Sequence, residues 1–246
     1  MACGKFPRLF MRLAAPVLIG LLAFLPLCAG EKDPDPRRFD EEITRFLEWD
    51  RQNSVPANAA LFAGSSSIRL WKTAEDFPQL PVINRGFGGA HISDVLFFME
   101  KIVLPYRPAV IVFYAGDNDI ADGKSAETVQ ADFRQFVERV HRSLPETRII
   151  FLPIKPSLAR WNFWPEMKKA NGLIEAYCAG DERLFYADTA APMLAGGGKP
   201  GSELFVEDGL HLSAAGYRLW SQVLKPVLEK ALAHDRKADR AVKNVE

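Results

Sequence analysis

Short apolar runs alternate with longer amphipathic segments along most of this 246-residue chain. The clearest run covers residues 109–114 and reads Ala-Val-Ile-Val-Phe-Tyr, without a polar interruption. Strands that are apolar at every position are typical of a parallel sheet, because helices cover both of its faces. Further strands are expected at 59–63, 81–84, 149–154 and 184–187. The alternation therefore predicts an α/β fold with a doubly wound parallel sheet of about five strands.

Helical periodicity and capping residues fill the segments between these runs. Residues 39–52 place their apolar side chains at helical spacing, which predicts a helix there. Ser93 or Asp94 is predicted to cap a helix that runs to about residue 104. Ser125 and Ser213 are predicted to open two further helices, because a short oxygen-bearing side chain can accept hydrogen bonds from free N–H groups at a helix start.

The first thirty residues have the composition of a secretory signal peptide. Basic residues precede an almost entirely apolar stretch at 13–27, and small residues lead to an expected cleavage after Gly30. This stretch is short for a membrane span of about 20 residues, so we expect removal of residues 1–30 in preference to a retained anchor or lipidation at Cys28. The mature protein is then expected to be periplasmic or secreted, without a stable membrane span.

The remaining chain is expected to contain one main domain. A charged lead-in and helix occupy 31–58, the main domain covers 59–232, and a charged tail follows at 233–246. Lys plus Arg and Asp plus Glu both number 31, so the balanced charge does not favour nucleic acid as a partner. Cys178 is the one cysteine outside the predicted signal peptide, and we expect it to be a buried small hydrophobic residue. The sequence does not indicate an oligomeric state.

Polar loops are expected at the carboxyl ends of the strands, where ligands bind in a doubly wound sheet. The four loops have the sequences Gly64-Ser65-Ser66-Ser67, Asn84-Arg85-Gly86-Phe87-Gly88-Gly89, Gly116-Asp117-Asn118-Asp119 and Asp208-Gly209-Leu210-His211. Carboxyl ends of parallel strands share one edge of a sheet. We therefore expect these loops to build a single active site.

A serine hydroxyl becomes a good nucleophile only when a base accepts its proton, and an imidazole is the usual base. Of the four histidines, His211 alone has a nearby carboxylate, that of Asp208, spaced to accept a hydrogen bond from Nδ1. His141 on a helix and His234 in the tail are expected to be solvated. His91 follows two glycines and is a candidate for substrate binding.

Each motif also has an ordinary structural interpretation. The serine cluster can cap a helix, and the Asp208 segment can be a polar turn before a helix. Gly88-Gly89 can form a tight turn, although a glycine there can also expose an N–H group to an oxyanion. Asn118 can form a turn or offer its side-chain amide to the same oxyanion. The combination of motifs is more specific than any one of them.

Taken in order, the four loops resemble the signature blocks of the SGNH, or GDSL-type, hydrolase family. The resemblance covers about residues 59–232 and implies a flavodoxin-like, three-layer α/β/α sandwich. It also implies hydrolysis of esters or related acyl bonds without a metal or an organic cofactor. It assigns a catalytic triad of Ser66, Asp208 and His211, and an oxyanion hole of Ser66, Gly89 and Asn118.

One block departs from the family pattern. Ser65 occupies the position at which the family usually has an aspartate, and this predicts a less rigid loop. Alignment on Gly64 selects Ser66 as the nucleophile ahead of its serine neighbours. Replacement of Asp208 by asparagine is expected to cost less activity than loss of the nucleophile or the base.

The predicted function is a serine hydrolase that cleaves carboxylic esters through an acyl-enzyme. A short acyl group such as acetyl, on a carbohydrate or lipid, is preferred, and nucleic acid is not an expected partner. Trp161 and Trp164 follow the fourth strand and are candidate substrate-binding residues together with His91.

Other functional classes fit less well. The Gly-x-Ser-x-Gly elbow of α/β-hydrolases is missing from the sequence. The segment Gly86-x-Gly88-x-x-His91 fails the dinucleotide-binding pattern at its last position. Thr128 stands where a calcium loop starting at Asp117 needs its terminal glutamate, so no metal site is expected. A flavodoxin-like protein that binds phosphate or another ligand, and an acyltransferase that uses the same triad, remain alternatives.

Overall fold

In the computed structural model of the protein, residues 1, 33–194, 196 and 198–243 are described, with side chains up to residue 233. The predicted cleavage and lipidation sites, and the signal peptide apart from Met1, lie outside the described residues. Along the described part of the chain, no helix combines the length and apolarity needed to cross a bilayer.

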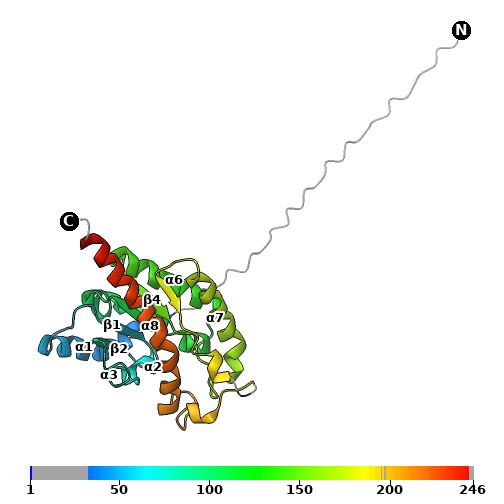
Figure 1. Cartoon of the computed structure of the whole chain (residues 1–246). Helices are drawn as coiled ribbons and strands as arrows, with labels where there is room; N and C mark the ends of the chain where they lie inside the picture. The colour runs from blue at the N-terminus through cyan, green and yellow to red at the C-terminus, as the bar shows by residue number, and fades with distance from the viewer. Residues whose placement is uncertain (2–32, 195, 197, 244–246) are drawn as a thin grey trace. The chain divides into compact units, whose positions relative to one another are not determined.

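Five parallel strands form one sheet, as the apolar runs predicted (Figure 1). They are β1 (Ala60–Gly64), β2 (Val82–Gly86), β3 (Val110–Tyr114), β4 (Arg148–Phe151) and β5 (Leu184–Tyr186). Their order is β2-β1-β3-β4-β5, which is the flavodoxin-like order. The direction of winding reverses between β1 and β3, and ligands of such sheets bind beside this point.

Helices cover both faces of the sheet and complete three layers. The longer helices are α1 (Asp40–Gln52), α4 (Ile92–Ile102), α6 (Ala126–Ser143), α7 (Trp164–Cys178) and α8 (Ala214–Lys243). Buried side chains of α1, α4, α6 and α7 share one core, whereas those of α8 belong to the other. The short helices are α2 (Ser66–Arg69), α3 (Thr73–Asp76) and α5 (Asp117–Ala121). Single 3₁₀ turns occupy Pro36–Phe39, Leu104–Tyr106, Trp161–Phe163, Ala191–Leu194 and Ser202–Leu204.

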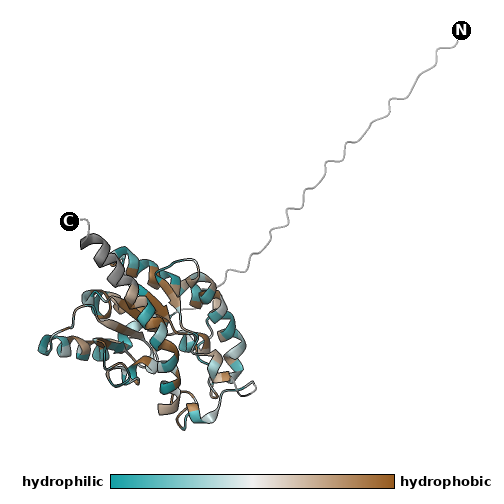
Figure 2. Ribbon diagram, viewed as in Figure 1, coloured by the Kyte–Doolittle hydropathy of each residue, from teal (hydrophilic) through white to brown (hydrophobic). Residues whose placement is uncertain are grey.

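Each strand divides its side chains between the two cores. In β3, Ile111 and Phe113 pack with α4, α6 and α7, whereas Val112 and Tyr114 pack on the side of α8. Successive residues of a strand point to opposite faces, so both sets must be apolar. Figure 2 shows this pattern, with apolar strands inside and hydrophilic residues on the outer helix surfaces. The strands therefore appear in the sequence as uninterrupted apolar runs, because helices cover both faces of the sheet.

The predicted start of α4 was wrong by two or three residues, because His91 occupies the capping position. The helix begins at Ile92, and Asp94 lies inside its first turn. The Asp94 carboxylate accepts a hydrogen bond from the N–H of His91 at 2.8 Å. Ser93 donates its hydroxyl hydrogen to Asp33 at 2.8 Å. Asp94 thus contributes to the capping box of α4 from its third position, with His91 as the capping residue, and Ser93 is used in another contact. The predicted cap at Ser125 is confirmed, because its Oγ accepts from the N–H of Thr128.

Strand β2 continues two residues further than its apolar run predicted. Arg85 lies within the strand, and its side chain is buried. The guanidinium forms an ion pair with Asp50 of α1 and donates to the hydroxyl of Tyr106 at 2.7 Å. It also lies over the rings of Phe46 and Trp49. A charge that is paired in this way can be buried at modest cost, so the strand accommodates an arginine.

Candidate active site

The proposed nucleophile lies at the turn between β1 and α2. Gly64 ends the strand with a φ of +137°, which strongly favours glycine. A Cβ at this position would lie 1.8 Å from the carbonyl oxygen of Tyr114 in β3. The N–H of Ser65 donates to that same oxygen at 2.9 Å. The chain therefore turns tightly against β3 and places Ser66 at the first position of α2.

Backbone hydrogen bonds hold the turn at Ser65, where the family usually has an aspartate. The carbonyl of Ser65 accepts from the N–H groups of Ile68 and Arg69, and the carbonyl of Gly64 accepts from Phe87. These contacts surround the position at which the departure occurs. The loop is thus tied to three neighbouring segments although Ser65 offers no carboxylate.

Ser66, His211 and Asp208 form a continuous hydrogen-bonded chain. The Ser66 Oγ lies 3.0 Å from Nε2 of His211, and the His211 Nδ1 lies 2.6 Å from Oδ2 of Asp208. Residues 145 positions apart in the sequence are therefore brought within hydrogen-bond reach. An imidazole that donates from Nδ1 to a carboxylate has Nε2 free to accept a proton from the serine. This is the geometry that an acyl-transfer nucleophile requires.

The neighbouring serines are excluded from this chain by their placement. Ser65 and Ser67 are completely buried, and their hydroxyls have no hydrogen-bond partner among the described residues. Ser66 alone of the three contacts His211. The alignment on Gly64 and the geometry therefore point to the same residue.

The turn of residues 208–211 holds the carboxylate in its charged form. Oδ1 of Asp208 accepts from the N–H groups of Leu210 and His211, both at 2.8 Å. Burial acts to raise the pKa of Asp208, but the hydrogen bonds from the His211 side chain and these two N–H groups outweigh it and lower the pKa to about 2. The carboxylate is thus anionic at neutral pH and can stabilise a protonated imidazole.

Two donor groups lie at the adjacent strand ends. Gly89 has a φ of +76°, and nothing lies within 4 Å of the position that a Cβ would take. The open space leaves its backbone accessible, while the positive φ accounts for the glycine. Asn118, in the first turn of α5, donates one Nδ2 hydrogen to the carbonyl of Ala90 at 3.0 Å. An amide nitrogen has two hydrogens, so this contact uses one of the two.

Comparison with known proteins identifies the family and the fold. Residues 64–219 match the GDSL-like Lipase/Acylhydrolase family, and this range includes all four polar loops. The chain belongs to this family. The resemblance that the motifs indicated is thereby confirmed, and so is the three-layer α/β/α fold.

Relatives of this GDSL-like chain include animal enzymes and bacterial structures. The platelet-activating factor acetylhydrolase IB subunit alpha1 of Homo sapiens and that of Pongo abelii are each 30% identical over 182 residues, which cover 72% of this chain and 78% of theirs. A GDSL-like lipase from Bacteroides thetaiotaomicron has a TM-score of 0.66 at 21% identity, with 77% of this chain and 98% of that chain covered. An acetylxylan esterase from Geobacillus stearothermophilus has a TM-score of 0.55 at 14% identity, with 70% and 94% covered.

The structure places His91 away from the surface of this GDSL-like site. Its side chain is only 2% exposed, and Nε2 lies 2.8 Å from Oδ2 of Asp122. It directly precedes α4 and packs beside the buried carboxylate of Asp119. So little exposed surface does not support the substrate contact predicted for His91. Gly88 and Gly89 belong to the turn that precedes His91, and the imidazole packs inward from this turn.

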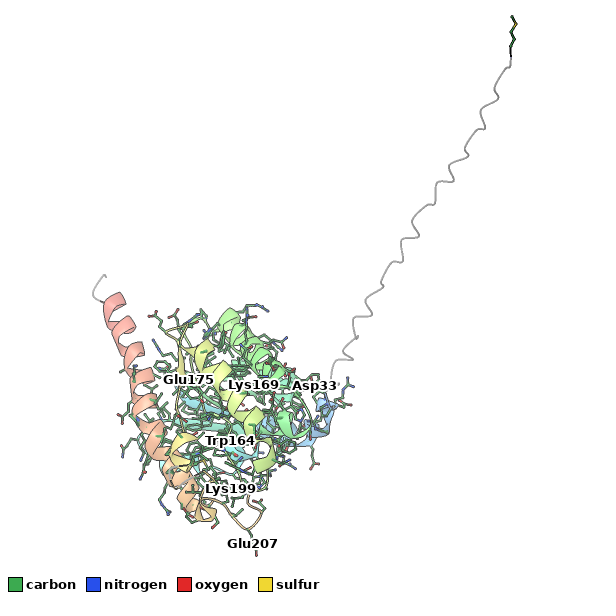
Figure 3. The ribbon with its side chains drawn as sticks, turned by 90° about the vertical axis from the view of Figure 1, so that its right-hand side faces the viewer. Asp33, Trp164, Lys169, Glu175, Lys199 and Glu207 are labelled. Carbon is green, nitrogen blue, oxygen red and sulfur yellow. The ribbon has the colours of Figure 1, made fainter. Side chains whose placement is uncertain are left out.

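Trp161 and Trp164 form a half-buried pair at the start of α7. Their rings are stacked, with centroids 6.2 Å apart and planes inclined by 16°. The ammonium of Lys199 lies 5.8 Å from the centre of the Trp161 ring. In Figure 3, Lys199 lies below Trp164, toward the end of the domain from which Glu207, the neighbour of Asp208, projects. The two tryptophans thus remain available for contacts with a bound molecule.

Two further predictions concern residues outside the site. Cys178 is buried, as predicted, and burial raises the pKa of its thiol to about 12. His141 was expected to be solvated, but it is half-buried, and its Nε2 lies 3.0 Å from the carbonyl oxygen of Thr147. The helical pattern placed His141 on an outer face, and the chain that follows α6 folds back over it. The side chain of His234 lies outside the described residues.

Sequence reasoning missed a charged cluster beneath the site. Lys155 is buried and donates to the Tyr114 hydroxyl and to Oδ2 of Asp117, both at 3.0 Å. Arg160 approaches the same carboxylate at 3.2 Å and donates to Oδ1 of Asn118 at 2.9 Å. The available signal was the position of both basic residues just after the fourth strand, at the edge where the other loops meet. Among the described residues, no group of His, Cys, Asp and Glu side chains is arranged to hold a metal.

Proposed function

We propose that the protein is a serine esterase that cleaves carboxylic esters through an acyl-enzyme. The observation that carries this proposal is the contact of 3.0 Å between Ser66 Oγ and His211 Nε2, backed by the carboxylate of Asp208. Membership of the GDSL-like family supports hydrolysis of an acyl bond.

The proposed reaction has two halves. His211 accepts the proton of Ser66 as Oγ attacks the ester carbonyl, and the imidazolium then protonates the leaving alcohol. The resulting acyl-enzyme is attacked by water, whose proton passes to His211 and from there to the departing Ser66 Oγ, and the free acid is released. The N–H groups of Ser66 and Gly89 and the Asn118 side chain would donate to the oxyanion in both halves.

A short acyl group, acetyl above all, is the proposed substrate portion. The curated relatives at 30% identity are named acetylhydrolases, and they are matched over 78% of their length. The alcohol portion is proposed to be a carbohydrate or a lipid, with Trp161 and Trp164 as candidates to contact it. Stacked, half-buried indole rings are suited to either, since both present apolar faces. We also propose that the enzyme acts in the periplasm or outside the cell.

The decisive experiment compares Ser66→Ala with Ser67→Ala on p-nitrophenyl acetate. Ser66→Ala should lower kcat by about 10⁴-fold or more, because the nucleophile is lost, while Ser67→Ala should stay near the wild-type rate. A fluorophosphonate probe should add to Ser66 in the wild-type protein, as mass spectrometry of peptides can show. Undiminished turnover in Ser66→Ala would eliminate the proposal and leave a ligand-binding role.

A second set of assays addresses substrate choice. Esters of increasing acyl length and acetylated sugars should reveal a maximum at short chains. Addition of an alcohol or sugar acceptor, with analysis of products, distinguishes hydrolysis from acyl transfer by the same triad. Transfer to the acceptor as the main reaction would replace water by an alcohol in the second half-reaction and would leave the roles of Ser66 and His211 unchanged.

A further inference from the structure

The orientation of the Asn118 amide is fixed by contacts on both of its ends. Nδ2 donates to the carbonyl of Ala90 at 3.0 Å, and Oδ1 accepts from Nη2 of Arg160 at 2.9 Å. If the amide were rotated by 180°, two acceptors would face each other at Ala90 and two donors at Arg160. Both hydrogen bonds would then be lost in a buried place, at a cost of about 1–3 kcal/mol for each unpaired group.

Arg160 is itself held by a second contact on the neighbouring residue. Its Nη1 lies 3.2 Å from Oδ2 of Asp117, and Asp117 is buried. The two ends of one guanidinium thus engage consecutive residues of the chain at the end of β3. A guanidinium is planar and rigid, so a position fixed by Asp117 also fixes the hydrogen bond to Asn118. A lysine ammonium, as a single point, would not reproduce both contacts.

The loop that carries Arg160 also contacts the turn of the catalytic base. The N–H of Ala159 donates to the carbonyl of Gly209 at 3.1 Å, and Gly209 lies between Asp208 and His211. Adjacent residues of one loop therefore touch the turn of the base through Ala159 and the oxyanion donor through Arg160. These two parts of the site are distant in the sequence, since 91 positions separate Asn118 from Gly209.

The charge of the cluster favours an oxyanion nearby. Lys155 and Arg160 bring two positive charges to the single carboxylate of Asp117. Burial acts to raise the pKa of Asp117, but Lys155 and Arg160 lower it overall, so the carboxylate stays ionised and one positive charge remains in excess. A fixed positive charge beside a developing negative charge stabilises it most effectively where water is excluded.

We propose that Arg160 is a positioning residue that holds the Asn118 amide with Nδ2 toward the oxyanion and links this donor to the turn of Asp208 and His211. The proposal rests on the proposed function, because it assigns Arg160 a role in the same reaction. Arg160 acts through Asn118 and is not required to touch the substrate. Its loss should therefore affect the transition state far more than the binding of the ester.

The test measures kcat and KM for p-nitrophenyl acetate in Arg160→Met and Arg160→Lys. Loss of one oxyanion donor lowers kcat by about 10²–10³-fold, and a donor that is present but misoriented should lose part of this. We expect kcat of Arg160→Met to fall by about 10–100-fold, with KM changed by less than about threefold. Arg160→Lys should lose about tenfold, since one contact is kept. Arg134→Met is the matched control, because Arg134 is exposed and pairs with the exposed Glu138 on α6.

A double-mutant comparison separates positioning from a general structural role. Once Asn118→Ala has removed the amide, adding Arg160→Met should lower kcat by less than about threefold, because its target is gone. An equal loss in both backgrounds, or an unchanged kcat in Arg160→Met, would overturn the proposal. If Arg160→Met does not fold, a wild-type kcat in Arg160→Lys overturns it as well. Turnover that survives Ser66→Ala would instead refute the proposed function, so the two failures are distinguishable.

Discussion

Replacement of Asp208 by asparagine should be far more harmful than the loss of one charge suggests. In the wild-type turn, Oδ1 accepts two backbone hydrogen bonds and Oδ2 accepts one from Nδ1 of His211. An asparagine has only one oxygen. If that oxygen keeps both backbone N–H groups, the amide nitrogen faces Nδ1 and donates to it. The imidazole must then carry its proton on Nε2, the atom that has to accept the proton of Ser66.

The opposite amide orientation is the costlier one. It would restore the correct imidazole tautomer, but it would place an NH₂ group against two backbone donors. Two hydrogen bonds would be lost and none gained, because Nδ1 is bonded in both orientations, and a net hydrogen bond contributes about 0.5–1.5 kcal/mol. The difference of about two bonds favours the inactive tautomer. The half-exposed position of Asp208 lets water reduce this difference but does not reverse its sign.

The expected result is a loss of kcat of about 10³–10⁴-fold, which corresponds to about 4–5.5 kcal/mol of barrier. This revises the milder effect that we expected from the sequence, in which the two backbone contacts are invisible. Initial rates on p-nitrophenyl acetate measure it, with thermal unfolding as the control for folding. Asp208→Ala should retain at least as much activity as the asparagine variant, because it leaves the tautomer free. An Asp208→Asn enzyme with more than about a tenth of wild-type kcat would refute this reasoning.

Three further predictions concern single residues. Ser65→Ala should change kcat by less than about twofold and the melting temperature only slightly, because the lost hydroxyl has no partner among the described residues; a large loss of turnover would contradict this expectation. Cys178 should resist iodoacetamide at about pH 8 until the protein is unfolded, as peptide mass spectrometry can follow, since its pKa is raised to about 12. Burial, and secondly the charge of Arg183, lowers the pKa of His141 below its usual 6.5. As the pH falls through this value, the unfolded chain binds a proton at His141 that the folded protein does not bind. The wild-type melting temperature should therefore decrease below about pH 6.5, and His141→Gln should weaken this decrease; identical pH profiles would contradict it.

Strand positions were predictable because their cause is local. Apolar side chains are needed at every position of a strand that helices cover on both faces, and this leaves an unbroken run in the sequence. Strand ends were less accurate wherever a distant partner decided them. Arg85 belongs to β2 only because Asp50 and Tyr106 are present to receive its guanidinium. Asp50 and Tyr106 are 35 and 21 residues away from Arg85, so a short stretch of sequence around Arg85 contains neither of them.

For the site as well, local motifs were predictable and contacts between distant residues were not. The four loops could be found because each follows a strand or precedes a helix and carries its reactive residue in a short motif. The contacts between loops could not be found, since nothing in the sequence near Arg160 refers to Asn118 or Asp117. His91 shows the converse case, because its glycine-rich surroundings suggested an open loop whereas the imidazole is buried beside Asp119 and bonded to Asp122, 31 residues away.

The chain segments that connect the strand ends to the proposed reacting groups are very short. Ser66 lies two residues beyond the end of β1, Gly89 three beyond β2, and Asn118 four beyond β3. One inserted residue can lengthen an extended chain by about 3.3–3.6 Å, which exceeds the tolerance of a hydrogen bond. The loops at the opposite edge, such as 53–59 and 179–183, have no such constraint. Length differences between homologous sequences should therefore accumulate at that edge, and it is also the better place to graft a peptide tag.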